Sequence, residues 1–102
     1  MTRYEIWFLN LDPTIGAEIQ KTGPCVIVSP PQLDYLKTRI IAPITSKGFE
    51  APYRLNFKLL GKDAKILCDQ IRSVSVDRFV FKVGELSLKH SKELSTILKE
   101  MF

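Results

Sequence analysis

The chain has 102 residues, 45% of them apolar, and a formal net charge of +4. This length suffices for one hydrophobic core and is too short for two, so we expect a single domain over residues 1–102. No apolar run approaches the roughly 20 residues of a membrane helix, and Met1 to Glu5 lacks the composition of a signal peptide, which favours a cytoplasmic protein with no membrane segment.

The first part of the chain is predicted as two strands around a long polar loop. Tyr4 to Leu9 is rich in β-branched and aromatic residues, and Cys25 to Val28 is a second apolar run. Between them, Asp12 to Gly23 is polar and interrupted by glycine and proline. Loops of this length in small domains are usually lids or binding segments, although a tolerated surface excursion would have the same composition.

A third strand is expected from Arg39 to Ile44. Pro43 has no N–H to donate, so we expect it at a sheet edge or at the end of the strand. Thr45 and Ser46 follow, and two neighbouring hydroxyls at a strand end can donate to an anionic ligand. Local hydrogen bonds to the backbone of the turn are the common alternative.

The segment from Tyr53 to Leu59 alternates between apolar and polar residues, which is typical of a half-buried strand. Its odd positions, Tyr53 included, are predicted to face the core. The even positions form a basic, hydrogen-bonding outer face and are Arg54, Asn56 and Lys58.

Another strand is expected from Ala64 to Arg72. Burying an ionised carboxylate is costly unless it is paired, so Asp69 near the end of this strand is either partnered or exposed in a cleft. An ion pair between Asp69 and Arg72 is the structural alternative to a functional role.

The rest of the chain is read as Ser73 to Val76, a last strand from Phe79 to Val83, and a helix capped by Ser87. Apolar residues of the helix recur on one face, at Leu94, Ile97, Leu98 and Met101. The order of five to seven short strands and one helix predicts a mainly β (α+β) fold, a small antiparallel β-barrel with the helix covering one face.

Basic residues are concentrated in the middle of the chain. Residues 34–65 hold seven lysines and arginines against three acidic residues, an excess equal to the whole net charge. Such a segment can attract polyanions, although on charge alone an ordinary solvated surface is the simpler interpretation.

The two cysteines are expected to be buried free thiols, because Cys25 and Cys68 lie within apolar runs. A disulfide between them is disfavoured in a reducing cytosol. The single histidine, His90, lies in the predicted helix and is read as a surface residue, so no metal site and no cofactor are expected.

Five segments match one family in order and spacing and together cover nearly the whole chain. They are Ile6 to Glu18 (IWFLNLDPTIGAE), Lys21 to Ser29 (KTGPCVIVS), Ala42 to Ser46 (APITS), Asp69 to Val74 (DQIRSV) and Val83 to Leu86 (VGEL). With these segments the chain resembles the MazF/PemK toxins of bacterial type II toxin–antitoxin systems.

The resemblance implies an SH3-like β-barrel with a terminal helix, a fold shared with the gyrase poison CcdB, and a homodimer. It also implies a metal-independent, sequence-specific endoribonuclease that cuts single-stranded RNA. In that chemistry the ribose 2′-hydroxyl attacks the adjacent phosphate and leaves a 2′,3′-cyclic phosphate and a 5′-hydroxyl. The reaction requires a base, an acid and donors to the developing negative charge.

Three cationic positions of the family carry other residues here. Gly23 stands where many members have an arginine, Ala17 where the PemK branch has a histidine, and Leu67 where that branch has a second arginine. The resemblance therefore implies the fold more strongly than it implies catalysis.

The residues that remain make up the predicted site. Asp69 is assigned as the general base, Thr45 and Ser46 as the groups that hold the scissile phosphate, and Glu18 as a further catalytic residue. Lys21 or Arg72 would supply the missing positive charge. The predicted substrate-binding residues are Lys21, Gln70, Arg72, Lys47 and Arg54.

Two alternatives of other classes remain open. A non-catalytic, CcdB-like gyrase-binding toxin, or a degenerate member that binds RNA without cutting it, would explain the missing cationic groups. An SH3-like binding module of unrelated role would not explain the order of the motifs.

The resemblance also implies a cognate antitoxin as a partner. Its acidic, partly disordered tail would lie across the basic site and displace the loop from Asp12 to Gly23.

The sequence predicts one of two outcomes for an Asp69→Asn change, depending on the role of Asp69. A catalytic base predicts a folded, inactive protein, whereas a buried ion pair predicts a loss of on the order of 3–5 kcal/mol of stability.

Overall fold

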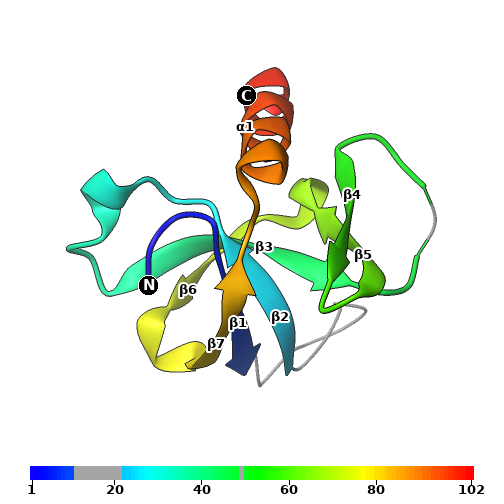
Figure 1. Cartoon of the computed structure of the whole chain (residues 1–102). Helices are drawn as coiled ribbons and strands as arrows, with labels where there is room; N and C mark the ends of the chain where they lie inside the picture. The colour runs from blue at the N-terminus through cyan, green and yellow to red at the C-terminus, as the bar shows by residue number, and fades with distance from the viewer. Residues whose placement is uncertain (11–21, 49) are drawn as a thin grey trace.

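The structure consists of one curved antiparallel sheet and a C-terminal helix (Figure 1). The computed structural model describes residues 1–10, 22–48 and 50–102. Within these ranges, none of the helices is both long enough and apolar enough to cross a bilayer. The elements are β1 (Glu5–Asn10), β2 (Thr22–Ile27), η1 (Pro31–Leu33), β3 (Thr38–Thr45), β4 (Arg54–Leu59), β5 (Lys62–Leu67), η2 (Cys68–Gln70), β6 (Arg72–Ser75), η3 (Val76–Arg78), β7 (Phe79–Glu85) and α1 (Leu88–Met101), where η marks a single turn of 3-10 helix.

Strand β3 connects the two halves of the sheet. The strand order is β4-β5-β3-β2-β1-β7, and β6 also pairs with β3. The first half of β3, Thr38 to Ile41, pairs with β6, whereas Ile44 and Thr45 pair with β5. The strands β5 and β6 thus follow one another along the side of β3 that faces away from β2. The predicted fold class, a curved antiparallel β structure with a C-terminal helix, is confirmed.

Two predicted strand boundaries are wrong for reasons that this topology explains. Pro43 lies inside β3 rather than at an edge, at the point between the residues paired to β6 and those paired to β5. The predicted strand from Ala64 to Arg72 is interrupted by η2, where the chain leaves β5 and turns into β6.

Tyr53 was predicted to face the core, and the structure contradicts this. The residue lies before β4 with a positive φ of 62°, and its side chain is exposed. Its carbonyl accepts a hydrogen bond from the N–H of Cys68, at 3.1 Å. Tyr53 therefore belongs to the turn that enters β4, and the inward alternation begins at Leu55.

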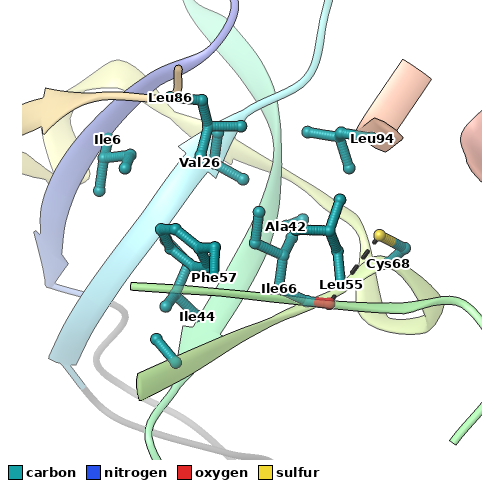
Figure 2. Close-up of a cluster of buried hydrophobic side chains, with 11 residues drawn as sticks. Ile6, Val26, Ala42, Ile44, Leu55, Phe57, Ile66, Cys68, Leu86 and Leu94 are labelled. Carbon is teal, nitrogen blue, oxygen red and sulfur yellow. Dashed lines mark hydrogen bonds between the residues drawn. The ribbon is translucent and has the colours of Figure 1, made fainter. Parts of the chain in front are cut away.

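The sheet separates two clusters of buried side chains. The helix-side cluster lies between the sheet and α1, and in Figure 2 Leu94 of the helix points toward Val26 and Ala42. The far-side cluster lies on the opposite face. Its buried members are Leu9, Cys25, Ile27, Ile41, Val74 and Phe79, with Trp7 packed against them.

Both cysteines are buried free thiols, as predicted, and each belongs to a different cluster. Burial disfavours the thiolate, and it raises the pKa of Cys25 to about 12. Burial, with the nearby Asp69 carboxylate, raises the pKa of Cys68 to about 11. Both thiols are therefore protonated at neutral pH.

Helix α1 begins where the sequence predicts. The Ser87 hydroxyl accepts a hydrogen bond from the backbone N–H of His90, at 3.2 Å, which caps the first turn. His90, expected on the surface, is only partly exposed because its ring packs against Phe57 with 6.0 Å between ring centroids. The helix-side cluster holds Leu94 fully buried, while Leu88 on the same helix is 73% exposed.

The two leucines make a matched test of this packing. Leu94→Ala should lower the free energy of unfolding by about 2–5 kcal/mol, because it removes buried methyl groups and leaves a cavity. Leu88→Ala, the same change at an exposed position, should shift it by less than about 0.5 kcal/mol. Urea unfolding of both variants measures the difference, and equal stabilities would contradict the described packing of α1.

Candidate functional site

One face of β3, β4 and β5 carries polar side chains, and we call it the polar face. In β4, Leu55 and Phe57 point into the helix-side cluster, so the alternate residues point away from it. In β5 the same argument applies to the residues on either side of Ala64 and Ile66. The polar face consists of Thr45, Arg54, Asn56, Lys58, Asp63 and Lys65.

A cross-strand row runs over this face from β3 to β4. Thr45 is opposite Lys65, and Lys65 is opposite Asn56. The Lys65 ammonium donates to Asn56 Oδ1 and to Glu50 Oε1, both at 2.9 Å. The hydrogen bond from Lys65 is the main reason that the pKa of Glu50 is lowered. A hollow of about 420 Å³, lined in part by Ser46 and these three side chains, lies over the row.

Thr45 makes the local turn hydrogen bond that the sequence left as an alternative. Its Oγ1 accepts from the backbone N–H of Lys47, at 3.1 Å. An acceptor role leaves the hydroxyl proton available to donate to a ligand. The turn contact and the predicted contact to an anion are therefore compatible, and the first orients the hydroxyl for the second.

Arg54 binds Asp69, and this pair forms a second row on the polar face. Arg54 Nε donates to Asp69 Oδ1 and Nη2 donates to Oδ2, both at 3.2 Å, so the pair is bidentate. Arg54 is opposite Leu67 on β5, two residues beyond Lys65. Two residues of strand correspond to roughly 7 Å, so the two rows lie side by side on one face.

The sequence offered an ion pair between Asp69 and Arg72 as an alternative, and the predicted partner is wrong. The carboxylate is paired with Arg54 of β4 rather than with Arg72, since η2 turns the chain between Asp69 and β6. The Arg54 hydrogen bond is the main cause that lowers the pKa of Asp69. Asp69 is therefore ionised at neutral pH, and it accepts a proton less readily than an unpaired carboxylate.

The structure describes three of the other predicted site residues. Lys47 is exposed beyond the end of β3, and Gln70 ends η2. Arg72 begins β6 opposite Ile41, and its charge acts on the thiol of Cys25. Glu18 and Lys21 lie outside the described residues, and so do the position of Ala17 and most of the predicted loop from Asp12 to Gly23.

A groove of about 370 Å³ lies at the rim of the sheet, beside the polar face, and we call it the rim groove. Its lining includes Pro24, Thr45, Ser46, Lys47 and Lys62. Within residues 1–10, 22–48 and 50–102, the ion pairs of this region are Lys58–Asp63 and Lys65–Glu50. Neither Lys47 nor Lys62 has an ion pair in these ranges, and both side chains are exposed.

Comparison with known proteins identifies the family. A family model described as PemK-like, MazF-like toxin of type II toxin–antitoxin system matches residues 2–102. The chain belongs to this family. The predicted resemblance to MazF/PemK toxins is therefore confirmed over nearly the whole sequence.

Relatives of known sequence or structure agree. The chain is 30% identical to the endoribonuclease MazF9 of Mycobacterium tuberculosis, over 97% of this chain and 93% of the relative. Its fold matches MazF of Deinococcus radiodurans with a TM-score of 0.83 at 21% identity, over 99% of this chain and 94% of the other. It also matches a mycobacterial endoribonuclease solved with its cognate antitoxin, with a TM-score of 0.80 at 15% identity, over 98% and 92% of the two chains.

Sequence reasoning missed the contribution of Glu50 and Lys65 to the site. The alternation of residues 54–58 did indicate a hydrogen-bonding outer face that includes Asn56. The register that places Lys65 between Asn56 and Thr45 could not be read from either strand alone. The part of the chain that the structure describes has no group of three or more His, Cys, Asp or Glu side chains suited to a metal ion.

The exposure of the Asp69–Arg54 pair changes the expected stability of Asp69→Asn. The Asp69 side chain is 36% exposed, so water screens the pair and its loss should cost only about 1 kcal/mol. A carboxyl whose pKa is lowered on folding stabilises the protein above its ordinary pKa, and this contribution is lost as the pH falls. Thermal unfolding at pH 7 should show the small loss, and at pH 3 the variant and the wild type should be closer. A loss of 3 kcal/mol or more at pH 7 would contradict the exposed pair.

Proposed function

We propose that this toxin is a metal-independent endoribonuclease that cuts single-stranded RNA on the polar face of β3, β4 and β5. The observation that carries the proposal is the arrangement of two adjacent rows on one face, Thr45–Lys65–Asn56 and Arg54–Asp69. Hydroxyl, ammonium, guanidinium and carboxylate groups are then within reach of one phosphodiester. The family, and relatives named as endoribonucleases, support RNA as the substrate.

In the proposed reaction each group has one task. Thr45, Ser46 and Lys65 donate to the phosphate and hold it while negative charge develops on its oxygens. Asp69 accepts the proton of the 2′-hydroxyl as that oxygen bonds to phosphorus. The bond from phosphorus to the 5′-oxygen then breaks, the leaving oxygen takes up a proton from solvent water, and Asp69 returns its proton to the solvent. Glu18 and Lys21 stay predictions because they lie outside the described residues.

Arg54 is proposed to supply the cation that the chain lacks at Leu67. The two residues are directly opposite on β4 and β5, and the Cβ atoms of such a pair are roughly 5 Å apart. The guanidinium of Arg54, on β4, can thus occupy the space beside Asp69 that the side chain of an arginine at position 67 would occupy. The bidentate contact to Asp69 orients this guanidinium. The pair makes Asp69 a weaker proton acceptor and makes Arg54 a well-positioned cation.

The gyrase-binding alternative is not favoured. Two of the relatives reported above are named for endoribonuclease activity, and the family description names a MazF-like toxin. The polar face also offers donors suited to a phosphodiester. A member that binds RNA without cutting it is separated from a nuclease by the following assay.

The activity is tested with long single-stranded RNA in the presence of EDTA. The wild type should produce discrete fragments with 2′,3′-cyclic phosphate and 5′-hydroxyl ends. Asp69→Asn should lower the rate roughly 100- to 10,000-fold if it removes the base, and Thr45→Val roughly 100-fold or more because it removes a donor to the phosphate.

Thr96→Val is the matched control for Thr45→Val. Thr96 is exposed on α1, and its hydroxyl donates to the Lys92 carbonyl at 3.0 Å, so its loss should leave the rate unchanged. Absence of cutting at high enzyme excess, or cutting only after a metal is added, would overturn the nuclease proposal. Full activity of Asp69→Asn would remove Asp69 from the mechanism.

We further propose that the toxin acts in the cytoplasm as a homodimer and is neutralised by a cognate antitoxin. One structural relative is a complex of an endoribonuclease with its antitoxin, which supports an antitoxin partner for this chain. Lys47 and Lys62 provide positive charge for an acidic antitoxin segment, which would compete with RNA for the rim groove.

Light scattering tests the homodimer and the antitoxin complex in one experiment. The toxin alone should have twice the 11.7 kDa mass of the chain. Adding the product of the neighbouring antitoxin gene should raise the mass and stop RNA cleavage. Since the contact is electrostatic, the inhibition should weaken as salt is raised. A monomeric mass, or an antitoxin that binds without stopping cleavage, would count against this arrangement.

A further inference from the structure

Two phenylalanines form an exposed stack on strands β1 and β7. The rings of Phe8 and Phe81 lie 5.2 Å apart between centroids and are nearly parallel, at 4°. Phe81 is 52% exposed, so part of this large apolar side chain is open to solvent. Neither residue belongs to the buried clusters, and the proposed nuclease chemistry does not use them.

An irregularity in β7 turns Phe81 to the face on which it meets Phe8. Leu9 is opposite Phe79, whereas Phe8 is opposite Phe81, so Val80 is an extra residue at this point of β7. In a regular strand Phe79 and Phe81 would point to the same face. The extra residue instead leaves Phe79 in the far-side cluster and points Phe81 to the helix side. Such bulges often redirect a side chain beside a functional site.

The stack continues toward the rim groove. Phe8 is opposite Pro24 on β2, and Pro24 lines the groove together with Thr45, Lys47 and others. Strands are spaced by roughly 4.8 Å, so Phe8 lies about one strand from the groove lining and Phe81 about two. A single chain of linked nucleotides can therefore contact both the groove and the stack.

We propose that Phe8 and Phe81 form a base-stacking platform for single-stranded RNA, and that the phosphate next to the stacked base contacts the rim groove. The inference rests on the proposed function, because it extends the surface that the RNA substrate would contact. Every base has a flat π face, and stacking on an exposed aromatic ring is a common way to hold unpaired bases. The outer face of Phe81 offers such a ring.

The charges of the rim groove favour RNA over an apolar protein partner. The rim groove begins at Pro24, opposite Phe8, and presents Lys47 and Lys62, which have no ion pair within the described ranges. Unpaired cations followed by an aromatic surface match a ligand that alternates phosphates and flat bases. An antitoxin segment or a second copy of the chain are the other occupants, and the experiment distinguishes them.

The test measures binding separately from cleavage. The probe is a fluorescent single-stranded RNA oligonucleotide containing a site that the wild type cuts, with a 2′-deoxyribose at the cut position so that it is bound but not cleaved. Phe81→Ala should weaken binding roughly 5- to 100-fold, as the loss of one stacked base predicts. Phe81→Tyr keeps a flat ring and should bind like the wild type, whereas Phe81→Leu keeps apolar volume and should bind weakly.

Phe102→Ala is the matched control, because this phenylalanine is 81% exposed at the C-terminal end of α1. Its binding should equal that of the wild type. A series of oligonucleotides, each with one base replaced by an abasic site, then locates the stacked base. At one position the abasic change should weaken binding to the wild type but not to Phe81→Ala, since the two changes remove the same contact.

Three results would overturn the platform. The first is unchanged RNA binding by Phe81→Ala, and the second is equal binding by Phe81→Leu and Phe81→Tyr, which decides the question even if the alanine variant does not fold. The third is a Phe81→Ala variant that binds RNA normally but loses self-association or antitoxin binding, which would assign the stack to a protein interface. Failure of the wild type to cut RNA would refute the proposed nuclease instead, and the same variants would then be compared for binding to unmodified single-stranded RNA, which still decides the platform.

Discussion

The pairing of β3 with three other strands is the constraint on which the rest of the structure depends. Its register with β2, β5 and β6 determines which of its residues face α1 and which face the far side. A shift by one residue would turn every side chain of β3 to the opposite face. Thr45 would then point toward the apolar helix-side cluster, and Ile44 would be on the polar face. The apolar cluster therefore holds the candidate site in register.

The site shows how a sheet can place a charge from either of two neighbouring strands. Residues that are directly opposite share a face, so Arg54 on β4 reaches the same region as position 67 on β5. Leu67 is buried, and Arg54 provides the cation beside Asp69. The geometry of the cross-strand pair thus allows either strand to place a cation beside Asp69.

Local patterns in the sequence predict most of the fold, and register explains what they miss. The cap at Ser87, the buried face of α1 and the alternation in β4 follow from short segments. The interior place of Pro43 does not, because it depends on where β3 exchanges one partner for another. The partner of Asp69 also depends on strand pairing, so the local sequence suggested the nearby Arg72 instead. The partnership with Arg54 joins residues 15 positions apart through the pairing of β4 and β5.

The placement of the two thiols has a practical consequence. Cys25 lies in the far-side cluster and Cys68 in the helix-side cluster, so one thiol marks each face of the sheet. Both are protonated and shielded in the folded state, and alkylating reagents attack the thiolate. Modification of either cysteine therefore requires that its own cluster open. The rates of alkylation at the two positions would report the separate opening of the two faces, without any label being introduced.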